Sequence, residues 1–133
     1  MDLSVSKYVR FIGHVLHENI RKYYAIADIY VTLQDISCLS ASLLEAMICG
    51  DCIIALNTGD TRQVIKNNQN GILLNYSELN SLPSVLLELL NNEKYRRMLA
   101  NNAKKFAINK VWTWEKRADA EIKLVERLIQ ESS

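Results

Sequence analysis

The stretch Leu39–Leu56, LSASLLEAMICGDCIIAL, decides the fold, because it reads as a helix followed directly by a buried strand. Apolar residues recur at helical spacing in its first half, and we expect Ser40 and Ser42 to cap the helix start. Gly50 is a typical helix stop. The run Cys52–Leu56 is apolar and partly β-branched, as in a parallel strand that is covered on both faces. The stretch therefore predicts an α/β fold.

Glu45 is the one charged residue in the predicted helix, and it falls in the second turn. A carboxylate near a helix N-terminus that faces the end of a sheet can accept hydrogen bonds from hydroxyl groups. The free backbone N–H groups of the same helix start can hold an anion. Glu45 is thus a candidate binding residue, and the alternative is a solvated carboxylate on a helix surface.

Size and charge place the chain among ordinary globular proteins. It has 133 residues, enough for one domain with a real core, and 49% of them are apolar. The net charge of +1 and the lack of a basic stripe give no reason to expect a nucleic-acid partner. No apolar run approaches a membrane span, and the start lacks a signal-peptide core. We expect a cytoplasmic protein, either free or held at a membrane through partners.

Cysteine usage favours neither disulfides nor metal binding. Cys38, Cys49 and Cys52 make an odd count, which argues against a disulfide framework. Cys49 and Cys52 form a CxxC pattern, but at a predicted helix C-terminus and with Asp51 between them, and both features disfavour a thiolate. Two histidines elsewhere do not complete a convincing zinc site. We expect no metal, and cysteines that act as small buried apolar residues.

The rest of the chain predicts a parallel sheet of about four strands and a helical C-terminal part. Besides Cys52–Leu56, the expected strands are Tyr8–Gly13, Ala27–Leu33 and Gly71–Asn75, with a helix over His17–Ala27. Three apolar stripes at helical spacing follow from Ser77 on. We expect one domain over residues 1–133, with strand–helix units over about 8–75 and C-terminal helices over about 77–131.

Several motifs in this order resemble a known family, over about Val9 to Trp114. They are Ser37-x7-Glu45, then AMICG, the strand CIIAL, Thr58-Gly59-Asp60 and NGILL at Asn70–Leu74. The chain resembles the C-terminal, nucleotide-sugar-binding domain of GT-B retaining glycosyltransferases (glycosyltransferase group 1, GT4-like). The resemblance implies a partial Rossmann-like domain, and hexosyl transfer with retention in cell-surface polysaccharide or lipopolysaccharide biosynthesis. It also implies a nucleotide diphosphate-sugar as donor substrate, no cofactor and no obligatory metal.

The resemblance also implies the site residues. Glu45 would bind the ribose, the loop that contains His14 would border the base, and the helix start would hold the phosphates through Leu39, Ser40, Ala41 and Ser42. The family's first acidic residue, which contacts the transferred sugar, falls on Ser37. Asp35 lies two residues earlier and could take its place if the loop is rearranged. No catalytic residue is therefore certain.

The resemblance does not extend to the family's acceptor-binding N-terminal domain or to the start of its donor domain. We therefore expect no transferase activity from this chain alone, because glycosyl transfer needs donor and acceptor held together. An N-terminal domain or subunit from another chain would supply the rest. Two alternatives stay open: a truncated or accessory non-catalytic subunit that binds a partner chain, and another nucleotide-sugar enzyme of the same architecture, such as an epimerase.

The order of strands raises a question about the first one. In the Rossmann order 3-2-1-4-5-6, Tyr8–Gly13 would be the third strand and Ala27–Leu33 the fourth, with two strands between them that this sequence does not encode. We expect Tyr8–Gly13 either to close directly against Ala27–Leu33 or to pair with a partner chain, for example as a homodimer through the open edge. A monomer in which Val9–Ile12 is unpaired and exposed would contradict both.

Overall fold

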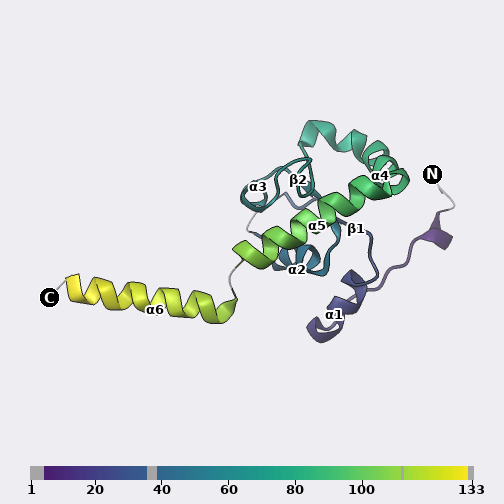
Figure 1. Cartoon of the computed structure of the whole chain (residues 1–133). Coiled ribbons are helices and arrows are strands. Elements are labelled where there is room, and N and C mark those ends of the chain that lie inside the picture. The colour runs from purple at the N-terminus through teal and green to yellow at the C-terminus, as the bar shows by residue number, and fades with distance from the viewer. Residues whose placement is uncertain (1–4, 36–38, 112, 132–133) are drawn as a thin grey trace.

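A computed structural model describes residues 5–35, 39–111 and 113–131, and it has the predicted α/β fold (Figure 1). Its sheet has the order β1-β2-β3, with β1 at Ile29–Thr32, β2 at Cys52–Leu56 and β3 at Ile72–Leu74. Both strand pairs are parallel. The helical elements are η1 (Ser6–Tyr8), α1 (His17–Tyr24), α2 (Ala41–Cys49), α3 (Thr61–Val64), η2 (Tyr76–Ser81), α4 (Leu82–Asn91), α5 (Glu93–Lys110) and α6 (Trp114–Glu131).

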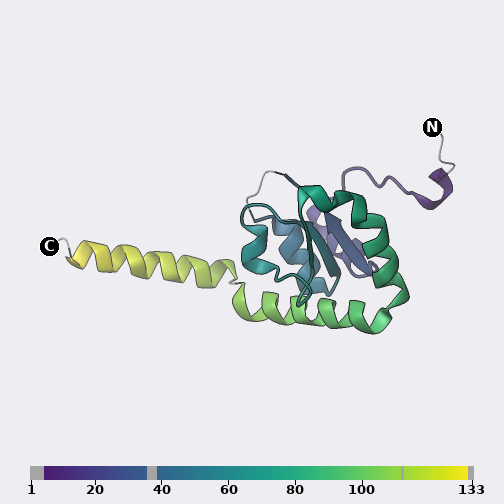
Figure 2. The ribbon, with the colours of Figure 1, turned by 90° about the horizontal axis from the view of Figure 1, so that it is seen from above.

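The core has two layers, one on each face of the sheet, and strand β2 between them is buried along its whole length. Side chains alternate along a strand, so Ile53 and Ala55 pack with helix α2 on one face of the sheet, while Ile54 packs with α4 on the other. Figure 2 shows the sheet between α2 and α4, with α5 running along one side. Helix α5 contributes to both layers, through Leu99 to one and Ala103 to the other. This packing fixes α2, which carries the candidate site.

Helix α2 ends as predicted, but its start is not capped as predicted. Gly50 has φ 97°, and its N–H donates to the carbonyls of Ala46 and Met47, so the helix ends there. The expected caps at Ser40 and Ser42 are wrong: no side chain caps the helix start. The two hydroxyl oxygens lie 2.6 Å apart instead, because two neighbouring hydroxyls can satisfy each other.

The expected strand over Tyr8–Gly13 is wrong, so the described residues form three strands and not about four. After the short turn η1, Val9–Ile12 has no strand partner in the described part of the chain. The side chains of Val9, Phe11 and Ile12 are 49%, 93% and 41% exposed. This contradicts direct closure against β1, whereas pairing of this segment with a partner chain stays a prediction. The physical reason is that a strand needs a neighbouring ladder, and the two strands expected beside it are not encoded here.

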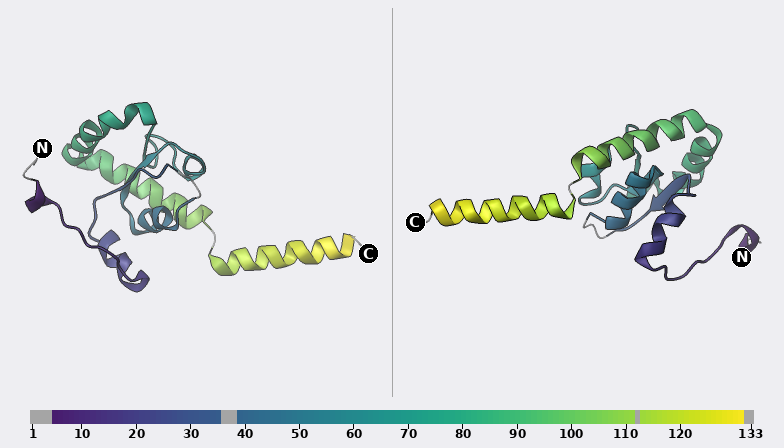
Figure 3. Two further views of the ribbon diagram at one scale, coloured as in Figure 1. Left: turned by 180° about the vertical axis from the view of Figure 1, so that it is seen from behind. Right: turned by 60° about the horizontal axis from the view of Figure 1, so that its bottom comes forward.

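The predicted C-terminal helices are confirmed as α4, α5 and α6. Helix α6 projects from the rest of the molecule (Figures 1 and 3), and the Lys116 N–H donates to the Thr113 hydroxyl at its start, as expected. One face of this helix is apolar and exposed, with Trp114, Ile122, Val125, Leu128 and Ile129 all more than half exposed. In the described part of the chain, no helix is both long and apolar enough to cross a membrane.

Candidate functional site

The candidate site lies where the parallel strands end, at the carboxyl edge of the sheet. Loops from all three strands are joined there by side-chain hydrogen bonds. The Thr58 hydroxyl donates to the Gln34 carbonyl over 3.1 Å, and the Asn57 amide donates to the Asn75 side-chain oxygen over 2.8 Å. Ligands of open α/β sheets bind at this edge. The edge therefore has the rigid frame that a binding site needs.

Helix α2 begins at this edge and presents its first turn there. The first helical hydrogen bond joins the Leu44 N–H to the Ser40 carbonyl, over 3.3 Å. An α-helix leaves the N–H groups of its first turn without an intrahelical acceptor, and they carry the positive end of the helix dipole. Leu39 and Ser40 are half-buried and Ala41 is exposed. The backbone predicted to hold phosphate is thus at the surface and faces solvent at one end of the sheet.

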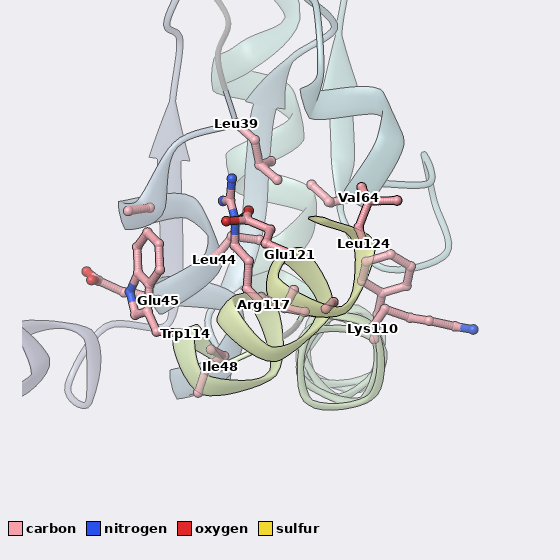
Figure 4. Close-up of a pocket in the computed structure, with 14 residues that line it drawn as sticks. Leu39, Leu44, Glu45, Ile48, Val64, Lys110, Trp114, Arg117, Glu121 and Leu124 are labelled. Carbon is pink, nitrogen blue, oxygen red and sulfur yellow. The ribbon is translucent and has the colours of Figure 1, made fainter. Parts of the chain in front are cut away.

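Glu45 lies one turn further along α2, close to two side chains of α1. The His17 Nε2 atom is 3.1 Å from Glu45 Oε1. Burial, and then the nearby Tyr30 and Glu45 groups, raise the pKa of Tyr24 to about 12. The Glu45 side chain is one-third exposed and that of His17 is 89% exposed, whereas Tyr24 is buried. In Figure 4 the Glu45 carboxylate points away from Val64, Leu124 and Lys110. The carboxylate is therefore fixed at one side and open to solvent at the other.

Neither His17 nor Tyr24 was expected near Glu45. The two residues are seven positions apart, about two turns of helix, so they lie on one face of α1. That spacing was visible in the sequence and could have marked them as a pair. The packing of α1 against α2, which brings the pair to Glu45, is a tertiary feature that spacing does not contain.

The other predicted site residues are placed differently. Ser37 lies outside the described residues. Asp35 is exposed in the loop after β1, and the nearby Asp35 carboxylate raises the pKa of Tyr76. His14 is exposed and lines a shallow pocket with Tyr23 and other residues at α1, a pocket that does not include Glu45. Asp35 and His14 are thus not brought to Glu45.

A mostly apolar pocket of about 680 Å³ adjoins the site between α2, α5 and α6 (Figure 4). Glu45 lies at its rim, and Ile48, Phe106 and Leu124 are among its walls. Its charged groups are largely paired: Arg117 Nε is 2.9 Å from Glu121, and the Arg117 guanidinium lies 5.6 Å from the Trp114 ring centre. Such walls suit an apolar group better than a diphosphate.

The two cysteines that the structure describes are as expected from the sequence. Cys49 is half-buried and Cys52 is fully buried, and both are free thiols, while Cys38 lies outside the described residues. Burial raises the pKa of the Cys52 thiol to about 11, which keeps it protonated near neutral pH. A buried, protonated thiol packs as a small apolar side chain.

A parallel sheet with helices on both faces, and a helix N-terminus at its carboxyl edge, defines a Rossmann-like domain, and the matches that follow identify it as one of the GT-B type. The family model for "Glycosyl transferases group 1" matches residues 2–106, so the chain belongs to that family. It is 31% identical over 122 residues to an uncharacterised glycosyltransferase, MJ1069, of Methanocaldococcus jannaschii, covering 91% of this chain and 31% of that protein. The chain thus spans about a third of the length of this relative.

Two solved structures show the same fold. Sucrose-phosphate synthase of Thermosynechococcus elongatus matches with a TM-score of 0.78 at 23% identity, over 98% of this chain and 33% of that one. HepE of Anabaena in complex with UDP matches with a TM-score of 0.77 at 19% identity, over 93% of this chain and 34% of that one. HepE is also solved in complex with UDP-glucose. At these identities the likeness concerns the fold.

Proposed function

We propose that residues 1–133 form a partial donor-binding domain of a glycosyltransferase, which binds a nucleotide diphosphate-sugar at the N-terminal end of α2. The backbone of Leu39–Ser42 would hold the diphosphate, and the Glu45 carboxylate would accept hydrogen bonds from the ribose hydroxyls. The position of Glu45, partly open to solvent in the second turn of α2, carries the proposal. Membership of the family and the nucleotide complexes of HepE support it.

The chemistry that fits such a site is hexosyl transfer with retention and without an obligatory metal. Charge that develops on the leaving diphosphate would be stabilised by the helix N–H groups, which are already in place before the reaction. The acceptor would be a precursor of cell-surface polysaccharide or lipopolysaccharide, held by an N-terminal domain or another subunit. The roles of Ser37 or Asp35 toward the sugar and of His14 toward the base stay predictions.

Replacing Glu45 with glutamine tests the proposal at its main residue. Glutamine keeps the size of the side chain but removes the charge that strengthens its hydrogen bonds, so Glu45→Gln should weaken binding of a nucleoside diphosphate roughly tenfold or more. Isothermal titration of the wild type with UDP, GDP and ADP identifies the base that binds most tightly. The variant is then titrated with that nucleotide.

The matched control is Glu18→Gln. Glu18 is an exposed carboxylate in the first turn of α1, so the same chemical change is made beside the site but not in it. We expect wild-type affinity for this control. Equal affinity of wild type and Glu45→Gln for a nucleotide that does bind would contradict the assignment of Glu45.

A second candidate function is favoured by the exposed apolar face of α6. A surface of this kind commonly marks a contact with another protein. An accessory subunit that binds a partner chain without catalysis would use this face and would need no donor. The nucleotide titration separates the two functions, because such a subunit is not expected to respond to UDP, GDP or ADP.

A further inference from the structure

His17, the first residue of α1, makes a contact with α2 that the proposed function does not use. Its Nε2 atom lies 3.1 Å from Glu45 Oε1, within hydrogen-bond distance, although the two residues are 28 positions apart. An ionised carboxylate can only accept a hydrogen bond, so the ring nitrogen is the donor and carries the proton. The contact therefore joins the proposed ribose-binding group to a neighbouring helix.

The packing of α1 holds this imidazole beside Glu45. Ile20 and Tyr24 follow His17 at helical spacing, so the three residues lie on one face of α1. Tyr24 is buried in the core cluster that contains Leu43 of α2, and Ile20 packs against the same cluster. His17 continues this face at the exposed start of the helix. An anchored helix thus presents the donor to Glu45.

The exposure of His17 decides what the contact can do. A hydrogen bond or ion pair between exposed side chains contributes little to folding, because water screens it and both side chains lose freedom. The same ordering helps a ligand, since a glutamate side chain that is already oriented loses less freedom on binding. We therefore expect the contact to affect nucleotide affinity and not the stability of the fold.

The contact also leaves room on the carboxylate for a ribose. His17 lies against Oε1, one of the two carboxylate oxygens of Glu45. An ionised carboxylate offers about four lone-pair positions in all. Both hydroxyls of a ribose diol can therefore donate to Glu45 while His17 stays in place.

We propose that His17 is a positioning residue, which orients the Glu45 carboxylate so that its free lone pairs meet the 2′- and 3′-hydroxyls of the bound nucleotide. The inference rests on the proposed function and deepens it, because it adds a residue of α1 to the donor site. His17 acts through Glu45 and does not touch the donor.

The experiment compares His17→Ala and His17→Gln with the wild type by isothermal titration of UDP, or of GDP or ADP if that nucleotide binds more tightly. Alanine removes the donor, whereas glutamine places an amide nitrogen as many bonds from the backbone as Nε2 of histidine. We expect His17→Ala to bind about two- to fivefold more weakly, and His17→Gln to bind within about twofold of the wild type. Glu18→Ala, at the neighbouring exposed residue of α1, should leave the affinity unchanged.

The 2′,3′-dideoxy form of the same nucleotide separates positioning from direct contact. It lacks the hydroxyls that Glu45 would hold, so the wild type and His17→Ala should bind it equally. If His17 contacted the base or the diphosphate instead, His17→Ala would bind both ligands more weakly. A general structural defect would also weaken both, and thermal unfolding identifies such a defect: the melting temperature of His17→Ala should stay within about 2 °C of the wild type.

Three outcomes overturn the inference while leaving the proposed function intact. They are an unchanged affinity in His17→Ala while Glu45→Gln binds weakly, an equal loss for the nucleotide and its dideoxy form, and a His17→Gln variant that binds as weakly as His17→Ala. If Glu45→Gln itself binds like the wild type, the proposed function fails and the inference fails with it.

A double variant gives an independent check. In a Glu45→Ala background there is no carboxylate to orient, so His17→Ala should cause no further loss of affinity. A further loss of about two- to fivefold in that background would show that His17 acts on the ligand without Glu45, against the inference.

Discussion

Replacing Leu43 with alanine is expected to lower the free energy of unfolding by about 3 kcal/mol or more. Leu43 is 1% exposed and packs in the same core cluster as Met47 and Ile53. Alanine would leave a cavity between α2 and the sheet, since a packed core relaxes only in part. Leu43 also lies in the first turn of α2, two residues before Glu45, so the cavity loosens the helix that carries the candidate site. Urea denaturation followed by circular dichroism measures the loss.

Leu87 provides a matched control for this change. It lies on α4 and is 60% exposed, so Leu87→Ala removes the same atoms from a position that stays largely in water. The expected loss for Leu87→Ala is within about 0.5 kcal/mol. Similar losses for the two variants would show that the core is not where the structure places it.

Asp51→Asn is expected to stabilise the protein at pH 7 to 8 by about 1–3 kcal/mol. Asp51 is 1% exposed, and its Oδ2 atom has no hydrogen-bond partner in the described part of the chain. Burial and the negative charge of Asp28 raise the pKa of this carboxyl to about 6. Because this pKa is higher in the folded protein than in the unfolded chain, the fold is favoured when Asp51 is protonated. Its stability falls as the pH rises from about 4 to about 6.

Asparagine has a similar shape and carries no charge at any of these pH values. The gap in free energy of unfolding between the variant and the wild type should therefore close toward pH 4. Thermal or urea unfolding at pH 4, 6 and 8 measures the gap. Asp119→Asn removes an exposed carboxylate on α6 and should show the same pH dependence as the wild type. A gap that is constant from pH 4 to pH 8 would mean that Asp51 does not titrate as described.

Local sequence features were sufficient for most of the fold. The strand over Cys52–Leu56 has the predicted bounds, because an apolar, β-branched run bounded by Gly50 has few alternatives. Helix α1 ends earlier than predicted, at Tyr24 and not at Ala27, and the three residues that follow it are exposed. Tyr8–Gly13 has a strand-like pattern but no strand, since pairing depends on neighbours that the pattern does not contain.

The candidate site was predicted only in part. The position of Glu45 in the second turn of α2 follows from the helix pattern and from the family motif. That His17 and Tyr24 lie near Glu45 is a result of how α1 packs against α2. A contact between residues 28 positions apart, such as that of His17 with Glu45, is not encoded in local spacing. The serine caps failed for a different, local reason: the Ser40 and Ser42 hydroxyls lie within hydrogen-bond distance of each other, and no side chain caps the helix start.

The most direct test of donor binding at α2 is a titration of the uniformly ¹⁵N-labelled chain with UDP, GDP and ADP, followed by amide chemical shifts. We expect at least one nucleotide to give saturable shifts at the backbone amides of Ala41, Ser42 and Leu43 and at Glu45, because these groups would surround the diphosphate and ribose. Shifts that do not saturate with any of the three nucleotides, or saturable shifts confined to α4 and the far half of α5, would contradict donor binding at the N-terminal end of α2.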